Sequence, residues 1–328
     1  MRYLLTKAAA FGFLSGLLFL TSVGAIAQTG AGTGNIRLRQ AVDYDGDGKA
    51  DQVVFRPSNN IWYVNKSGGG FIFQAFGLAA SDYMVPGDYD GDGKADIAVF
   101  RDSDGTWYRI NSSNGAVVIF QWGISGDEPV ARDYDGDGKT DVSVARRTNG
   151  QMIWYTLRSS DNGVSITQWG LSTDFTAPGD YDGDGKFDIT VQRPGATATS
   201  QAYFYTLNSS NGSVNIMPWG LSNDLVVPGD YDGDGKTDYA IVREGATSSD
   251  NLVWYVNKSS GGTLILSWGL TGSDLCVQND YDGDGKTDVG VWRDSNGTFY
   301  YLKSNGSGVG VVGWGSPNDY PVASYDTH

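Results

Sequence analysis

The stretch "DYDGDGK" is repeated through this chain of 328 residues, and the repetition constrains the fold more than any other feature. The copies begin at Asp43, Asp88, Asp133, Asp180, Asp230 and Asp280. Successive copies are 45 to 50 residues apart, a period that is typical of the blades of a β-propeller. The repeats therefore predict one repeated domain rather than two unrelated ones.

Four short segments of each repeat have the character of β-strands. In the second copy "DIAVFR", "TWYRI" and "VVIFQWG" are rich in β-branched and aromatic residues, and "EPVARD" supplies the short segment before the next motif. Tips such as "NSSNGA" provide the chemistry of tight hairpin turns. We name these strands A to D, with the motif between A and B. The predicted fold class is all-β, a propeller of four-stranded antiparallel blades, six in number.

Closure of the ring is predicted from a surplus segment at the C-terminus. Residues 319–328, "DYPVASYDTH", repeat the start of "DEPVARDYDG" and then stop, with Ser324 in place of the first Asp. We expect this half-repeat to act as a clasp beside the first blade, near residues 36–42. The alternatives are a seven-bladed ring with an incomplete blade, and self-assembly in which the surplus strand pairs with another molecule. A linear β-solenoid is disfavoured because its repeats are usually shorter and lack hairpin signals at each reversal.

Residues 1–27 have the pattern of a secretory signal peptide. Arg2 and Lys7 come before an apolar run, and the small residues Ala25 and Ala27 end the segment. We expect cleavage, a Gly-rich linker over 28–35 and a propeller over 36–328. The predicted location is secreted, extracellular or at the cell surface, with no membrane insertion after cleavage.

The charge of the chain is concentrated in the repeated motif. Each D-x-D-G-D-G-K-x-D unit has a net charge of −3, so the six units hold −18, while the whole chain is at −15. This acidity argues against nucleic acid or an anionic membrane as a partner. The single cysteine, Cys276, cannot form an internal disulfide, and we interpret it as a small buried hydrophobe. A secreted fold without crosslinks needs another source of stability.

The motif has the front of an EF-hand-type calcium loop. Positions 1, 3 and 5 offer carboxylates, position 7 a backbone carbonyl, and the glycine at position 6 a sharp turn. The glutamate of an EF-hand at position 12 is missing, but Asp at position 9 begins strand B and can supply the remaining ligand. A turn alone needs one or two such residues, whereas four aspartates recur in all six copies. We therefore predict Ca²⁺, about one ion per repeat.

From about residue 36 to 326 the chain resembles the FG-GAP or VCBS repeat family, which includes the calcium-loop blades of integrin α-chain propellers. The resemblance is carried by D-x-D-x-D-G-x-x-D in all six copies and by "WGLSTDFTAPGDYDGDG", which is similar to the F-G to G-A-P signature. Phe76 in place of Trp and "VQND" before the sixth motif depart from the pattern but change no ligand position. The resemblance implies these metal ligands, the lysines through their backbone carbonyls: Asp43, Asp45, Asp47, Lys49, Asp51; Asp88, Asp90, Asp92, Lys94, Asp96; Asp133, Asp135, Asp137, Lys139, Asp141; Asp180, Asp182, Asp184, Lys186, Asp188; Asp230, Asp232, Asp234, Lys236, Asp238; Asp280, Asp282, Asp284, Lys286, Asp288.

A ligand surface is predicted on the face opposite the metal loops. The A–B and C–D loops of a meander lie at one end of the blade, and all the length variation falls in the B–C loops at the other end. That end also carries a recurring Arg and the Trp that closes strand D, which together suit recognition of a sugar or a carboxylate. The candidate ligand-binding residues are Arg146, Arg193, Arg243, Trp122, Trp169 and Trp219. Their strict recurrence also suits a purely structural role.

These observations predict a secreted calcium-binding propeller for adhesion or recognition, in which calcium is structural and the ligand is an extracellular protein or glycan. The alternatives are a lectin-like carbohydrate binder, a polysaccharide lyase and a structural subunit of an extracellular polymer. No catalytic residue is predicted, because the only histidine is His328 and no Ser-His or Cys-His pair can form in the body of the fold.

Overall fold

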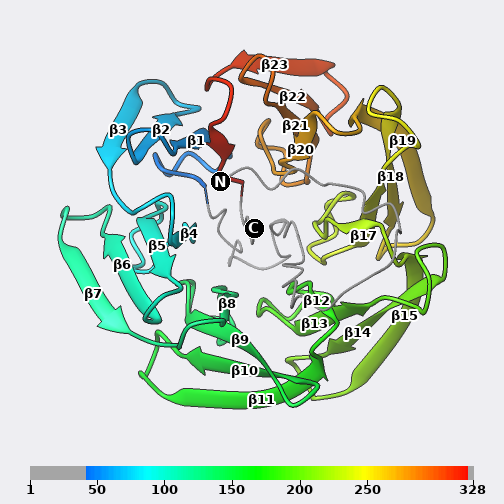
Figure 1. Cartoon of the computed structure of the whole chain (residues 1–328), viewed down its shortest axis with the longest axis horizontal. Coiled ribbons are helices and arrows are strands. Elements are labelled where there is room, and N and C mark those ends of the chain that lie inside the picture. The colour runs from blue at the N-terminus through cyan, green and yellow to red at the C-terminus, as the bar shows by residue number, and fades with distance from the viewer. Residues whose placement is uncertain (1–41, 324–328) are drawn as a thin grey trace, which may run out of the picture.

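A computed structural model describes residues 42–323 as six four-stranded antiparallel sheets arranged in a ring (Figure 1). This arrangement confirms the predicted all-β, six-bladed propeller. The predicted signal peptide and Gly-rich linker lie outside the described residues and stay predictions. Within 42–323, no helix has the length and apolar character needed to cross a bilayer.

Each blade contributes one strand of each type, in the predicted order. The innermost A strands are β4 (Asp82–Met84), β8 (Glu128–Pro129), β12 (Phe175–Thr176), β16 (Leu225–Val226), β20 (Asp274–Cys276) and β24 (Tyr320–Pro321). The B strands are β1 (Gln52–Arg56), β5 (Ile97–Arg101), β9 (Val142–Thr148), β13 (Ile189–Arg193), β17 (Tyr239–Arg243) and β21 (Val289–Arg293). The C strands are β2 (Ile61–Asn65), β6 (Thr106–Ile110), β10 (Gln151–Leu157), β14 (Gln201–Leu207), β18 (Asn251–Asn257) and β22 (Thr298–Leu302). The outermost D strands are β3 (Phe71–Ala75), β7 (Val117–Gln121), β11 (Val164–Leu171), β15 (Val214–Leu221), β19 (Thr263–Leu270) and β23 (Val309–Gly313).

Burial along each strand follows its place in the blade. Four consecutive residues of β5 are buried, because strand B has neighbouring blades against both of its faces, whereas β6 buries Trp107 and leaves Tyr108 half-buried. The turn between these strands holds Gly105 at φ 69°, and a Cβ there would lie 2.3 Å from the backbone of Gly123. Only glycine fits this hairpin without moving the segment that follows β7.

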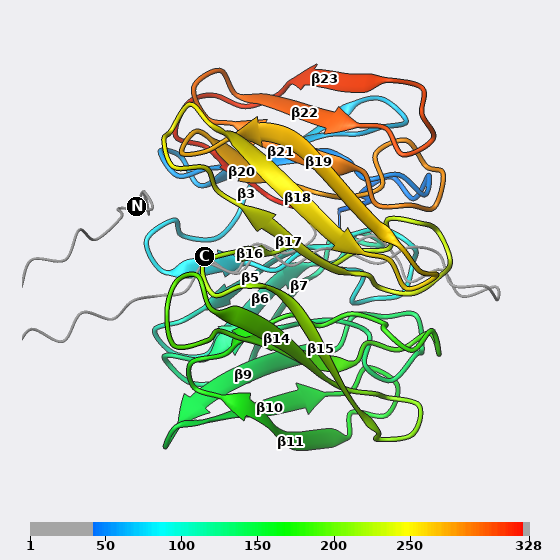
Figure 2. The same cartoon turned by 90° about the vertical axis from the view of Figure 1, so that its right-hand side faces the viewer.

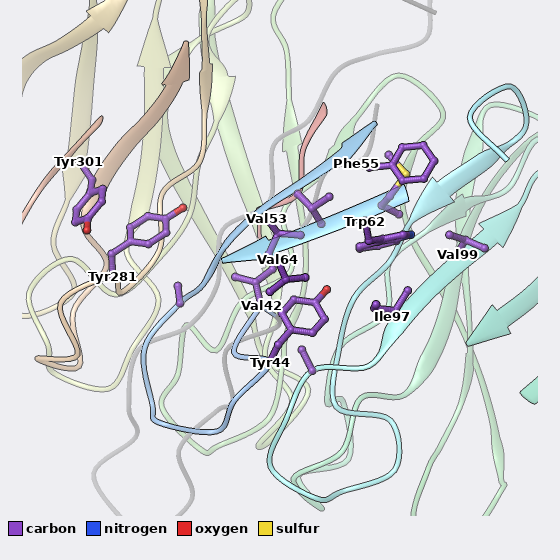
Figure 3. Packing of buried hydrophobic residues seen from close by; sticks show 14 residues of the cluster. Val42, Tyr44, Val53, Phe55, Trp62, Val64, Ile97, Val99, Tyr281 and Tyr301 are labelled. Atoms are coloured by element: carbon purple, nitrogen blue, oxygen red, sulfur yellow. The ribbon is translucent and has the colours of Figure 1, made fainter. Parts of the chain in front are cut away.

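The hydrophobic core is divided among the seams between blades. One cluster brings Val53 and Trp62 of the first blade together with Val99 of the second and Tyr281 of the last (Figure 3). Trp62 is completely buried there, and burying one large apolar side chain contributes about 1.5 to 3 kcal/mol. These clusters form where neighbouring blades pack against each other, and Figure 2 shows the blades of the ring from the side.

The C-terminal half-repeat completes the first blade. β24 pairs antiparallel with β1, with Phe55 opposite Tyr320, and the Val322 N–H donates to the Val53 carbonyl at 2.8 Å. The two ends of the ring thus meet in one sheet, and the red end of the chain lies beside the blue β1 in Figure 1. β24 is thus paired within its own chain, and self-assembly through the half-repeat stays a prediction.

The blades with longer B–C segments also have longer C and D strands. In the third, fourth and fifth blades strand C has seven residues and strand D eight, against five for both in the other blades. In the fourth blade the extension pairs Gln201 with Leu221 and shifts the register before Tyr203. Three consecutive blades therefore extend further at the B–C end than the rest of the ring.

We expect Asp319→Ala to destabilise the ring at its closure. Asp319 accepts two hydrogen bonds from Arg56, both at 2.8 Å, and its side chain is only 2% exposed. Removing one partner of such a buried pair costs about 2 to 4 kcal/mol in the free energy of unfolding, which chemical denaturation would measure.

The matched control for this variant is Asp161→Ala. Asp161 pairs with Arg158 at the surface with its side chain 56% exposed, so its loss changes stability by less than about 1 kcal/mol. Equal stability of the two variants would contradict a closing role for Asp319.

Candidate metal centre

The loop between strands A and B is folded around its first aspartate, as the second blade illustrates. The buried Asp88 accepts hydrogen bonds from the N–H groups of Gly91 at 2.6 Å and Gly93 at 2.9 Å. These glycines have φ values of 84° and 93°, which glycine adopts without strain. The same two bonds form in all six loops.

Asp at position 9 returns to the start of the loop, as predicted. Asp96 comes directly before β5 and is completely buried. One of its carboxylate oxygens accepts from the N–H of Tyr89 at 3.0 Å, and the other accepts from the N–H of Ser112 at 2.7 Å. Strand B therefore begins directly after Asp96 has closed the loop.

The predicted carboxylates gather closely enough to share one ion. In each of five loops, three Asp residues place ligand oxygens within 4.8 Å of one another. The triads come from positions 1, 3 and 5 or from positions 1, 3 and 9: Asp43, Asp45, Asp51; Asp88, Asp90, Asp92; Asp133, Asp135, Asp141; Asp180, Asp182, Asp188; Asp230, Asp232, Asp234. Hard oxygen donors at these positions suit calcium.

The electrostatics of these loops also fit a cation. Burial raises the pKa of Asp51 to about 7 and that of Asp96 to about 6, although hydrogen bonds to the backbone act in the opposite direction. A raised pKa means that the ionised form is disfavoured, and a divalent cation among the carboxylates would reverse this. Asp45 and Asp232 each have a buried oxygen without a hydrogen-bond partner, which such an ion would satisfy.

Serines at the C–D tips complete the loops, and the sequence analysis did not single them out. Ser112 donates its hydroxyl to Asp92 at 2.9 Å, in addition to the N–H that it donates to Asp96. Each blade repeats this pair of bonds through one serine: Ser67, Ser112, Ser159, Ser209, Ser259 and Ser304. The signal in the sequence was their constant position five residues after the buried aromatic residue of strand C. The tip of one hairpin thus positions two carboxylates of the metal loop.

The six loops are also joined to each other. In each seam the N–H at position 8 of one loop donates to the carbonyl of the first Asp of the preceding loop, at 2.6 to 2.9 Å. The donor and acceptor pairs are Ala95 to Asp43, Thr140 to Asp88, Phe187 to Asp133, Thr237 to Asp180, Thr287 to Asp230 and Ala50 to Asp280. The last pair joins the sixth blade to the first, so the bonds form a closed circle.

In three of the six seams, a glycine before the first Asp of a loop faces a threonine at position 8 of the following loop. A Cβ on Gly87 would lie 2.6 Å from the Thr140 hydroxyl of the next blade, and Gly179 and Gly229 face threonines in the same way. Where position 8 is the smaller Ala95, the corresponding place in the preceding blade is taken by Val42, in the same buried cluster. The seam is therefore closely packed as well as hydrogen-bonded.

The lysines at position 7 lie along the preceding loop. A Cβ on Gly91 would lie 2.6 Å from Cε of Lys139, and all six loops have a comparable contact, with Lys49 over Gly283 at the closure. Their side chains thus cover a neighbouring loop and leave coordination to the backbone carbonyl, whose role as a ligand stays a prediction.

At the opposite end of the blades, the recurring Arg has an intramolecular partner. Arg146 donates two hydrogen bonds of 2.7 Å to Asp127 and lies over the ring of Tyr155. Equivalent Arg–Asp pairs occur in every blade: Arg56–Asp319, Arg101–Asp82, Arg146–Asp127, Arg193–Asp174, Arg243–Asp224 and Arg293–Asp274. These aspartates were not predicted from the sequence, although five of them precede their Arg by 19 residues. The recurring Arg therefore has a structural role, in which it pairs with a carboxylate of its own blade.

The Trp residues that close strand D connect neighbouring blades. Trp122, Trp169 and Trp219 donate their indole N–H groups to the carbonyls of Tyr155, Tyr205 and Tyr255 in the next blade, at 3.0 to 3.2 Å. The six predicted ligand-binding residues therefore all have structural contacts. Their ring faces and guanidinium groups remain partly exposed, so their role in ligand binding stays a prediction.

Comparison with known families identifies repeats of the FG-GAP type in this chain. The FG-GAP-like repeat matches residues 43–99 and 133–191, and the FG-GAP repeat matches residues 84–120. These segments confirm the expected resemblance. A comparison with curated proteins finds no match at the level of sequence.

Two solved structures have a similar fold. TolB from Acinetobacter baumannii superimposes with a TM-score of 0.53 at 16% identity over 83% of this chain, which spans 63% of that TolB chain. A triple arginine-to-alanine mutant of AofleA from Arthrobotrys oligospora gives a TM-score of 0.51 at 9% identity, over 82% of this chain and 87% of its own. At these identities the likeness shows the fold alone.

We expect Gly87→Ala to destabilise the seam between the second and third blades. The added Cβ would lie 2.6 Å from the hydroxyl oxygen of the half-buried Thr140, and overpacking of this kind costs about 1 to 3 kcal/mol in the free energy of unfolding. Chemical denaturation of the variant would measure the loss.

The double variant Gly87→Ala/Thr140→Ala supplies the control. In the first seam the counterpart of Gly87 is the larger Val42, and the counterpart of Thr140 is the smaller Ala95. The double variant changes both residues in these directions, so most of the stability should return. A double variant no more stable than Gly87→Ala would show that the contact between these two residues is not the cause.

Proposed function

We propose that this chain, a six-bladed propeller that contains FG-GAP and FG-GAP-like repeats, is a calcium-stabilised recognition module that works outside the cell. The observation that carries the proposal is the set of Asp clusters in the A–B loops, which are hydrogen-bonded into one circle. The metal loops are thus part of the seams between blades, where the core of the molecule lies.

Calcium suits these loops better than magnesium. The donors are carboxylates and backbone carbonyls in an irregular loop, whereas magnesium demands near-ideal octahedral geometry and keeps several waters. We infer about six ions, one per loop, each held by the four aspartates and the position-7 carbonyl. A bound ion would compensate the like charges and stabilise the seam on either side of it.

Export from the cell is supported by the sequence at residues 1–27 and by the need for this ion. Loops of extracellular modules commonly bind calcium with dissociation constants of about 10⁻⁴ to 10⁻³ M, which suits calcium-rich surroundings. The single Cys276 leaves the chain without an internal disulfide, so calcium would supply the stabilising crosslinks.

Recognition rather than catalysis is supported by the side chains available. Residues 42–323 contain no histidine, and burial raises the pKa of the Cys276 thiol, which makes it a poor nucleophile. The face that carries the B–C hairpins is free of the metal loops and varies most in length between blades. We therefore place an extracellular glycan or protein ligand on this face, in a role such as adhesion.

Calcium removal tests the structural half of the proposal. At about 2 mM calcium and a dissociation constant of about 10⁻⁴ M, each occupied site adds about 2 kcal/mol of stability, so a chelator should lower the thermal midpoint strongly. Native mass spectrometry should count about six ions on the wild-type chain, and one fewer on Asp90→Asn. An unchanged midpoint in chelator, or a chain without ions, would sink the calcium assignment.

Arrays of glycans and extracellular matrix proteins test the recognition half. We expect binding to at least one ligand in calcium and its loss in chelator, because the B–C face depends on the seams that calcium stabilises. Failure to bind any ligand in calcium would count against recognition while leaving the metal assignment intact.

A further inference from the structure

We propose that the groove between the fourth and fifth blades binds one ring of a neutral sugar. This inference rests on the recognition function proposed above and specifies its ligand class and its site.

The groove is a cavity of about 250 Å³ that lies where β15 meets the fifth blade. It is lined by Gln201, Pro218, Trp219, Gly220, Leu221, Ile241, Arg243 and Tyr255. Pockets for drug-sized ligands start at about 300 Å³, so this cavity suits a single ring with the rest of the ligand in solvent.

The extended hairpin of the fourth blade supplies one end of the groove. Gln201 and Leu221 pair at the end of β14 and β15, beyond the point where the shorter hairpins stop. The register of this hairpin shifts between Gln201 and Tyr203. Without it, two of the eight lining residues would be missing and the groove would be open at that end.

The apolar walls of the groove offer stacking surfaces. The indole N–H of Trp219 is already donated to the Tyr255 carbonyl at 3.2 Å, so the side chain has only its ring to offer a ligand. Pro218 is exposed beside it, and Leu221 is half-buried. A sugar ring presents C–H groups on its face and suits such rigid aromatic and apolar walls.

The charge of the groove favours a neutral ligand over a carboxylate. Arg243 donates to both oxygens of Asp224, at 2.8 and 2.7 Å, so its positive charge is compensated within the protein. Asp224 accepts from two of the five N–H donors of the guanidinium, so a ligand carboxylate would meet a cation whose charge is already compensated. The Arg243 side chain is nevertheless 36% exposed, the largest value among the six recurring arginines, and its remaining N–H groups can donate to a hydroxyl.

Gln201 supplies a further polar group at the rim. Its Nε2 donates to the carbonyls of Ala202 at 2.9 Å and Gly220 at 2.8 Å, which holds the exposed side chain across the end of the groove. Among the described residues none donates to its Oε1, which can therefore accept from a sugar hydroxyl. Aromatic walls with one donor and one acceptor provide the few polar groups that orient a sugar.

Saturation-transfer NMR on the calcium-loaded chain tests this site. The probes are the methyl glycosides of glucose, galactose, mannose and fucose, with glucuronic and galacturonic acid as their anionic counterparts. We expect transfer to at least one neutral glycoside and weaker transfer to both uronic acids. Pro218→Arg, an exposed position whose new side chain would fill the groove, should weaken binding about tenfold.

The matched control is Ser267→Arg in the fifth blade. Ser267 pairs with Val253 as Pro218 pairs with Tyr203, so it occupies the same register position at the next seam. This variant should bind as the wild type does.

Three results would overturn the proposal: equal binding by Pro218→Arg and wild type, stronger binding of the uronic acids, or no transfer to any of the four neutral glycosides. If a calcium-dependent ligand is found on the arrays in any of these cases, recognition stands and only the groove assignment fails.

Discussion

Repulsion among closely spaced carboxylates is the constraint on which the rest of this structure depends. Each A–B loop concentrates four aspartates within nine residues, and the first of them also offers its backbone carbonyl to the following loop. The same short segment therefore makes the metal cluster, the corner between two strands and the contact between two blades. Because the apolar clusters also lie in the seams, whatever relieves the repulsion in the loops also favours the packing of Trp62 and its equivalents.

Much of the fold and of the metal site could be predicted because a repeated chain shows the same local pattern several times. The strand order, the turn chemistry and the carboxylate positions all belong to segments that are continuous in sequence. The partner of Arg101 could not be identified in this way, since Asp82 is 19 residues away and contacts it only after the A and B strands have paired. Contacts between blades, such as Gly87 with Thr140, were hidden for the same reason.

The two ends of the blades have separate roles. At one end the A–B loops hold the negative charge, and Ser112 and its equivalents tie each loop to the hairpin beside it. At the other end the Arg–Asp pairs neutralise their own charges and the Trp residues connect neighbouring strands. Because of this separation, the hairpins of the third to fifth blades can be longer than those of the other blades without disturbing the carboxylate loops.

The pairing of β24 with β1 has a consequence for how the chain reaches its native state. Phe55 and Tyr320 are paired across 265 residues, whereas the equivalent Tyr83 and Phe100 of the second blade are separated by 17. By chain statistics alone, the longer closure costs about 2 kcal/mol more. The first blade must therefore wait as a three-stranded sheet until nearly the whole chain has been synthesised. During that interval the unpaired edge of β1 is open to other strands, which makes ring closure the step at which folding competes most directly with aggregation.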